Sequence, residues 1–241
     1  MGKRIITQRR GRGTLTYIAH SFRFKGKISL RKLDETETTS AIYGRVIDLM
    51  HCPGHSAPLA KIRYDNGEEI LISAPLGIKV NDAVSSGTAS NISIGNVLPL
   101  RKIPAGTEIY NIETKPGDGG RLARCSGTTA IVITQADENV VVRLPSKKEK
   151  TLNGNCRAVV GMAAGGGRKD KPFIKAGKRW HAMHARGKLY PQTSGVAMNA
   201  VDHPFGSGRG RHIGKSKVAP RHAPPGRNVG TIRSRRTGVK K

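Results

Sequence analysis

Asp202 and His203 stand side by side, and this pair is the first place where the sequence suggests acid–base chemistry. A carboxylate that orients an imidazole can make it a general base, as in a nuclease or another RNA-processing enzyme. Adjacent residues on an irregular chain rarely face one another, however. A metal-dependent nuclease would also need paired carboxylates, and the only other acidic residue after position 160 is Asp170. We therefore expect no enzymatic activity and interpret His203 as a residue that contacts a phosphate or a base.

A second candidate chemistry is zinc binding by cysteine and histidine. The sequence has no Cys-x-x-Cys pair and no second pair at zinc-finger spacing. A helix would place His181 and His184 on one face. Three scattered cysteines also argue against a disulfide scaffold. The residues that could supply zinc ligands are His51, Cys52, His55, Cys125, Cys156, His181 and His184. We expect no metal and no cofactor, and interpret these cysteines as small buried residues and these histidines as RNA contacts.

Glycine-rich stretches offer a third kind of site, one for phosphate groups. Neither Gly117-Asp-Gly-Gly120 nor Gly165-Gly-Gly-Arg168 matches the mononucleotide loop Gly-x-x-x-x-Gly-Lys-Ser/Thr. Glycine does allow backbone N–H groups to approach phosphates closely, and neighbouring arginines add charge-assisted hydrogen bonds. Alternating Gly and Arg elsewhere predicts a thin cationic chain that fits between RNA helices. The arginines singled out on these grounds are Arg12, Arg121, Arg124, Arg168, Arg209, Arg211 and Arg227.

The charge distribution indicates what these residues bind. The 241-residue chain carries a formal net charge of +27. Residues 1–33 contribute +10 and residues 161–241 contribute +17, whereas residues 34–160 are close to neutral. Such a concentration of charge favours a polyanionic partner, and RNA or DNA fits. A solvated charge run is the alternative, but the embedded Trp180, Met198 and Phe205 are not needed for that.

Hydrophobic content divides the chain at the same places. Leu, Ile, Val and Phe make up 32 of the 127 residues in 34–160 but only 11 of the 81 residues in 161–241. The C-terminal segment is too poor in apolar side chains to fold alone, so we expect its partner to impose its shape. No apolar run is long enough to span a bilayer and the N-terminus lacks a signal-peptide pattern. We therefore expect a soluble cytoplasmic protein that does not bind membranes.

The near-neutral middle has the pattern of short β-strands. An Asp65-Asn66-Gly67 turn between two apolar runs predicts a hairpin. The first set of expected strands is 41–50, 59–64, 68–73 and 78–84, and the second is 97–100, 108–112, 130–134, 140–144 and 156–160. The one expected helix is 173–186, weakened by Gly177. We expect an all-β fold of two small barrels, 34–84 and 85–160, with irregular basic extensions at 1–33 and 161–241.

Several motifs together resemble a known family. They include Gly117-Asp-Gly-Gly-Arg-Leu-Ala-Arg-Cys-Ser-Gly127, Lys171-Pro-Phe-Ile-Lys-Ala-Gly177 and Gly195-Val-Ala-Met-Asn-Ala-Val-Asp-His-Pro-Phe-Gly206. With Gln8-Arg-Arg-Gly-Arg-Gly13 and Ala223-Pro-Pro-Gly-Arg-Asn-Val-Gly230, they resemble the universal second protein of the large ribosomal subunit over the whole chain. Bacterial members usually have a second histidine at the position of Phe205, so the chain resembles the archaeal type of the family.

The resemblance implies an oligonucleotide-binding-type barrel, an SH3-like barrel and basic extensions buried in large-subunit ribosomal RNA. It implies early RNA binding, subunit assembly, association with the small subunit, neighbouring ribosomal proteins as partners and a position near the peptidyl-transferase region. His203 matches a family histidine long discussed as catalytic. The complete set of expected RNA-binding residues is Arg9, Arg10, Arg12, Arg121, Arg124, Arg168, Lys171, Lys175, Lys178, Arg179, Asn199, His203, Arg209, Arg211 and Arg227.

One stretch departs from the family pattern. Residues 51–57 read His-Cys-Pro-Gly-His-Ser-Ala, where the family usually has Asp-Pro followed by an arginine. Cys52 and His55 thus replace an acid and a base. If that pair braces the turn in relatives, this chain must hold the turn in another way.

Overall fold

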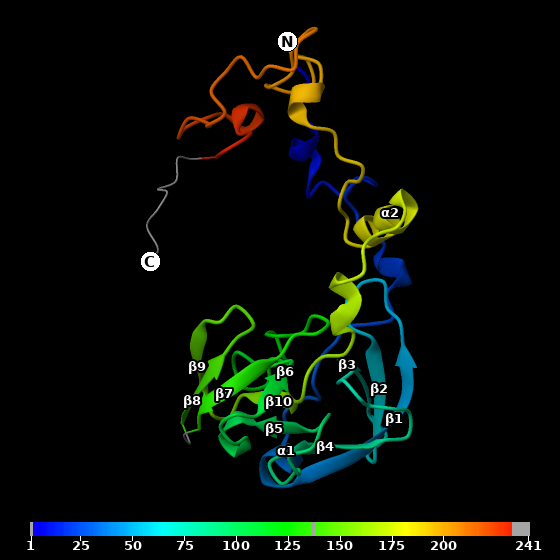
Figure 1. The fold of residues 1–241 in the computed structure, drawn as a ribbon. Helices are drawn as coiled ribbons and strands as arrows, with labels where there is room; N and C mark the ends of the chain where they lie inside the picture. The colour runs from blue at the N-terminus through cyan, green and yellow to red at the C-terminus, as the bar shows by residue number, and fades with distance from the viewer. Residues whose placement is uncertain (1, 136–137, 233–241) are drawn as a thin grey trace. The chain divides into compact units, whose positions relative to one another are not determined.

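The computed structural model describes residues 2–135 and 138–232, and the chain divides into two compact units. Ser21–Pro172 forms the unit that we call the barrel unit. Met1–His20 together with Phe173–Lys241 forms the second, which we call the extension unit (Figure 1). Each unit brings together side chains that are far apart in the sequence, and each is described separately below.

The first strands of the barrel unit form an antiparallel group in the order β3-β2-β1-β4. Their bounds are β1 (Ala41–Met50), β2 (Leu59–Tyr64), β3 (Glu69–Ser73) and β4 (Ala83–Gly87). The expected hairpin is confirmed, because β2 and β3 pair from Leu59 opposite Ser73 to Arg63 opposite Glu69. The expected strand 78–84 is wrong in position. Asn81 has a φ of 73° and Lys79 N–H donates to Asp82 Oδ2, so a turn occupies this stretch before β4 begins.

The remaining strands form a second group in the order β5-β10-β6-β7-β8-β9. Their bounds are β5 (Val97–Pro99), β6 (Glu108–Tyr110), β7 (Ala130–Thr134), β8 (Asn139–Arg143), β9 (Glu149–Asn153) and β10 (Arg157–Val160). The sequence missed β9, whose residues are exposed except for Leu152. This strand is at the edge of the sheet, where polar and charged residues are common.

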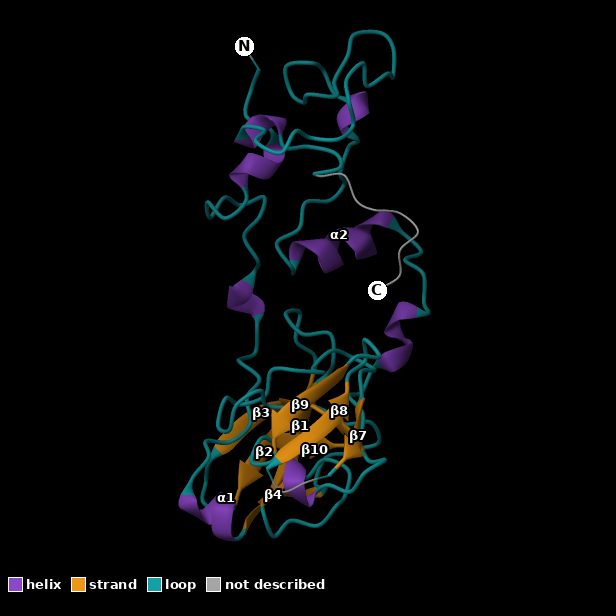
Figure 2. Ribbon diagram, turned by 90° about the vertical axis from the view of Figure 1, so that its left-hand side faces the viewer, coloured by secondary structure: helices purple, strands orange, loops and turns teal. Residues whose placement is uncertain are grey.

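The two strand groups are joined and share buried surface. A single parallel bridge pairs Ser86 of β4 with Val97 of β5. One hydrophobic cluster lies within the second group, and another combines first-group residues such as Val46 and Ile62 with Tyr110 and Val159 of the second. The expected all-β class is therefore confirmed, and Figure 2 shows the strands gathered in the barrel unit.

A buried charge network also connects elements of the barrel unit. Helix α1 (Glu35–Thr39), which the sequence analysis missed, is capped at its N-terminus by Asp34, whose side chain accepts the Glu37 N–H. Glu37 forms an ion pair with Arg157 of β10, whose guanidinium also donates to Glu113 Oε1 at 2.8 Å. All three side chains are almost completely buried. Burial alone would lower the pKa of Arg157, but its bonds to the two carboxylates raise it. A buried charge left without its partner is strongly destabilising, so the pairing fixes how these elements meet.

The extension unit contains little regular structure. Helix α2 (Ala176–His184) is shorter than the expected 173–186, because the backbone is extended at Lys175 and Gly187 adopts a φ of 61° just beyond its end. Short 3-10 segments cover Ile6–Arg9, Gly195–Ala197 and Pro225–Arg227. Among the residues that the structure describes, every helix is too short or too polar to cross a membrane.

Candidate nucleic-acid interface

The expected RNA-binding residues divide between the two units. The barrel unit carries Arg121, Arg124, Arg168 and Lys171, and the extension unit carries the other eleven. Arg124, His203 and Arg227 are half-buried, and the remaining twelve are exposed. The structure therefore presents these residues as two sets of exposed or half-buried polar side chains.

Carboxylates of the chain neutralise some cations of the barrel unit but none of the candidate arginines and lysines among the described residues. Arg31, Lys61, Arg63 and Arg157 of the barrel unit all lie in ion pairs with carboxylates. Within residues 2–135 and 138–232, none of the candidate arginines and lysines forms a salt bridge. Their charge is balanced only by solvent ions, which a polyanion can displace.

The glycine-rich turn at 117–120 differs from the expectation. Gly119 N–H donates to Glu113 Oε1 at 3.0 Å and Gly120 N–H donates to Asp118 Oδ1 at 3.1 Å. These N–H groups serve carboxylates of their own chain, so the expected approach of these N–H groups to phosphates is wrong here. Burial alone would raise the pKa of Asp118, but its hydrogen bonds with Thr114 and the backbone lower it. Arg121, which directly follows this turn, is exposed.

The second glycine-rich stretch holds Arg168 by a side-chain contact. Arg168 Nε donates to Ser126 Oγ at 3.2 Å, and Ser126 N–H donates to Ser56 Oγ at 3.0 Å. Gly127 N–H donates to the Ala163 carbonyl at 2.9 Å. The loop that carries Arg124 and the stretch that carries Arg168 therefore lie side by side and place two cations on one part of the barrel unit.

His203 is oriented by its own backbone and not by Asp202. Phe205 N–H donates to His203 Nδ1 at 3.0 Å, and the two rings meet edge to face with centroids 5.3 Å apart. Asp202 Oδ1 lies 3.7 Å from Lys3 Nζ. Burial lowers the pKa of His203. Its Nε2 thus carries the proton of the neutral ring and is the nitrogen left to donate to a partner.

The candidate zinc ligands do not converge. Cys156 lies fully buried in the core of the second strand group, and Cys52 lies fully buried beside Ile28 and Leu59. His184 Nδ1 lies 2.9 Å from His20 Nε2, and Trp180 packs against the His184 ring with centroids 4.3 Å apart. Nowhere in the described part of the chain do three His, Cys, Asp or Glu side chains gather in a way that could hold a metal ion.

The departing stretch 51–57 has its own internal brace. His55 Nδ1 lies 3.2 Å from Cys52 Sγ, which also accepts the Lys25 N–H at 3.4 Å. Burial and the positive charge of Arg124 lower the pKa of His55. The contact between Cys52 and His55, together with the Lys25 N–H, therefore braces this turn.

Two exposed cations that the sequence analysis did not single out belong with these residues. Arg186 and Lys188 flank Gly187 just after α2. The signal was present, because Arg-Gly-Lys repeats the alternation of glycine and cation that identified Arg209 and Arg211. The chain combines a β-rich unit that exposes cations with a basic unit of little regular structure. These features place it in the class of nucleic-acid-binding proteins.

Comparison with known proteins narrows this class to a family. Residues 3–86 match the RNA binding N-terminal domain of Ribosomal Proteins L2, and residues 93–223 match the C-terminal domain of the same proteins. The large ribosomal subunit protein uL2 of Methanothermobacter thermautotrophicus is 54% identical over 241 residues, with 100% of both chains covered. The corresponding proteins of Methanococcus aeolicus and Methanocaldococcus jannaschii are 52% identical, with 99% of both chains covered, and 50% identical, with 100% of both covered. The chain belongs to the L2 family of ribosomal proteins.

Proposed function

We propose that this chain is a structural, non-enzymatic component of the large ribosomal subunit in the cytoplasm, and that it binds large-subunit ribosomal RNA. Its finer roles are early RNA binding, subunit assembly, contact with neighbouring ribosomal proteins and with the small subunit, and support of the peptidyl-transferase region. Residues 34–84 and 85–160 are the two barrel domains in this proposal. Residues 1–33 and 161–241 are the extensions that lie against RNA.

Exposed or half-buried candidate cations without carboxylate partners in the described part of the chain support RNA as the partner. Carboxylates neutralise Arg31, Arg63 and Arg157 of the barrel unit, whereas the candidate cations lie in no salt bridge among the described residues. RNA phosphates would supply the missing negative charge and release condensed counterions. The proposed contact residues are the fifteen named in the sequence analysis, together with Arg186 and Lys188.

The dependence of RNA affinity on salt concentration tests this proposal. The full chain is titrated with large-subunit ribosomal RNA of Methanothermobacter thermautotrophicus, the source of a relative 54% identical to it. We expect log affinity to fall steeply with log salt concentration. Arg209→Gln combined with Arg211→Gln should reduce the slope by about 0.7–0.9 for each lost phosphate contact.

The matched control is Arg63→Gln, which removes a cation that is already paired with Glu69. This variant should leave the slope unchanged. A flat salt dependence of the unaltered chain, or an equal loss of slope in the control, would contradict the proposed RNA interface.

A further inference from the structure

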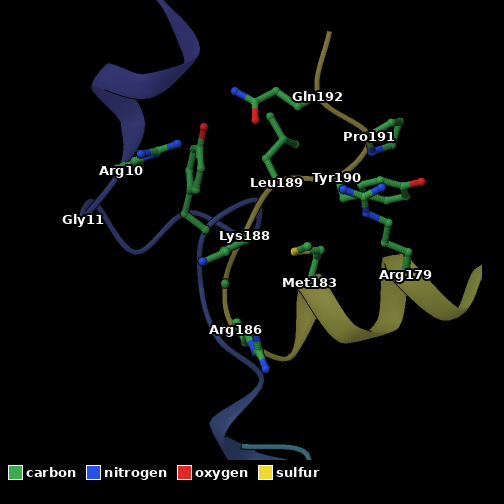
Figure 3. Close-up of a pocket in the computed structure, with 12 residues that line it drawn as sticks. Arg10, Gly11, Arg179, Met183, Arg186, Lys188, Leu189, Tyr190, Pro191 and Gln192 are labelled. Atoms are coloured by element: carbon green, nitrogen blue, oxygen red, sulfur yellow. The ribbon is translucent and has the colours of Figure 1, made fainter. Parts of the chain in front are cut away.

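The extension unit contains a half-open cavity of about 860 Å³ between its N-terminal and C-terminal segments. Arg10 and Tyr17 contribute from the N-terminal side, and Arg179, Arg186 and Tyr190 contribute from α2 and the chain that follows it (Figure 3). This volume lies within the roughly 300–1,000 Å³ typical of small-molecule sites. The cavity is therefore large enough for a single nucleotide.

The cavity combines positive charge with aromatic surface. Arg10, Arg179, Arg186 and Lys188 line it, and no carboxylate is among its described lining residues. An anion that enters meets four cations without a competing acidic group. This composition fits a phosphorylated ligand.

Two of the arginines are already stacked on aromatic rings. The Arg10 guanidinium lies 5.5 Å from the centre of the Tyr17 ring, and the Arg179 guanidinium lies 5.2 Å from the centre of the Tyr190 ring. In Figure 3, the Arg179 side chain extends from α2 to Tyr190. When a protein binds single-stranded nucleic acid, the bases stack on tyrosine rings and on arginine guanidinium planes. The cavity thus offers two stacking planes as well as phosphate-binding charge.

The lining also discriminates between kinds of anion. A peptide carboxylate would satisfy the charge but would leave both stacking planes unused.

We infer that this cavity binds one unstacked RNA nucleotide, with its base against Tyr190 and its phosphate beside Arg186 and Lys188. The inference rests on the proposed RNA binding and specifies its ligand at this place. It requires a nucleotide that leaves the base stack of the RNA, which single-stranded loops and bulges supply.

The complex of the full chain with large-subunit ribosomal RNA provides the test. Chemical footprinting with dimethyl sulfate and ultraviolet cross-linking with mass spectrometry are carried out on the same complex. Among the nucleotides that the chain protects, we expect one that also cross-links to a peptide that contains Tyr17 or Tyr190. Tyr190→Ala should remove this protection and lower RNA affinity about ten-fold with an unchanged salt slope, because no charge is lost. Tyr190→Phe, which keeps the ring, should restore both.

A charge variant and a matched control complete the design. Arg186→Gln combined with Lys188→Gln should reduce the salt slope, because two phosphate-directed cations are lost. Tyr43→Ala removes a tyrosine that is 59% exposed in the barrel unit and should change neither footprint nor affinity.

If the chain binds RNA with a steep salt dependence but Tyr190→Ala keeps the footprint and the affinity, the inference is wrong and the proposed function stands. A cross-link from Tyr190 to an acidic peptide of a neighbouring protein would also overturn it. Failure of the unaltered chain to bind RNA would overturn both.

Discussion

His203 uses one ring nitrogen within its own chain and leaves the other for a partner. The Phe205 N–H occupies Nδ1, and a side chain at Gly195 would overlap with the imidazole. The ring is thus fixed by a backbone hydrogen bond and by the absence of a side chain at position 195. Because burial lowers its pKa, the ring is neutral at neutral pH and offers Nε2–H as a donor. That arrangement suits recognition of a phosphate or base edge.

Substitution of His203 distinguishes a role in RNA recognition from a role in catalysis of peptide-bond formation. His203→Gln keeps a donor and an acceptor, so large subunits assembled with this variant should retain most of their peptide-bond formation. His203→Ala loses a contact worth about 1–3 kcal/mol and should mainly lower the yield of assembled subunits. The measurements are the yield of assembled large subunits and the rate of peptide-bond formation on purified ones. A His203→Gln subunit that binds its substrates but reacts thousands of times more slowly would establish a catalytic role.

Turns of the barrel unit depend on glycine for two separable reasons. Gly106 and Gly120 both adopt a positive φ, of 85° and 87°. A side chain at Gly106 would meet nothing, whereas one at Gly120 would overlap with Asn111. The two positions therefore have the same backbone requirement and different packing.

A pair of alanine variants should show this difference. Gly106→Ala should destabilise the barrel unit by about 1–2 kcal/mol, because alanine disfavours a positive φ. Gly120→Ala should cost at least about 1 kcal/mol more, because its methyl group must displace Asn111. Urea unfolding followed by circular dichroism measures both. Equal losses in the two variants would mean that Asn111 can move aside without cost.

The sequence predicted those strands and turns whose own residues show alternating hydrophobicity or a turn motif. Strand β2 alternates and ends in a strong turn, so its bounds are as expected. Strand β9 has one buried side chain, and its position depends on pairing with β8. Helix α1 has only five residues, although Asp34 followed by Glu37 is an N-terminal capping signal that could have identified it. Local pattern therefore failed at β9, whose place depends on pairing with β8 and not on burial of its own residues.

The candidate interface follows the same division. Alternation of glycine and arginine identified Arg209 and Arg211 without any structure. Tyr17 and Tyr190 line one cavity but are far apart in the sequence, so no spacing rule brings them together. The motif at 117–120 does not itself contain Glu113, the carboxylate that accepts the N–H groups of Gly117 and Gly119, so the motif alone could not predict that these groups are occupied.

The two units of the molecule differ in what stabilises them. The barrel unit has large clusters of buried aliphatic side chains and the buried network around Arg157. In the described part of the extension unit, the buried cluster consists of Ile5, Phe205 and Val229, with Val196 and Ile213 packed against it. Ordering a chain of this length costs about 1–2 kcal/mol per residue in backbone entropy, far more than so small a cluster offsets. Contacts with a partner must supply the difference.

Amide hydrogen exchange of the whole chain, with and without RNA, tests this division. In the free protein, amides of strands such as β1, β2 and β10 should exchange slowly, because opening them exposes a hydrophobic core. Amides of 173–232 should exchange fast without RNA and become protected when large-subunit ribosomal RNA is added, since RNA neutralises the charge that opposes compaction. The free protein in high salt is the control, because screening alone supplies no specific contacts. Strong protection of 173–232 in the free protein would show that the extension unit folds by itself, and that RNA binds an already ordered surface.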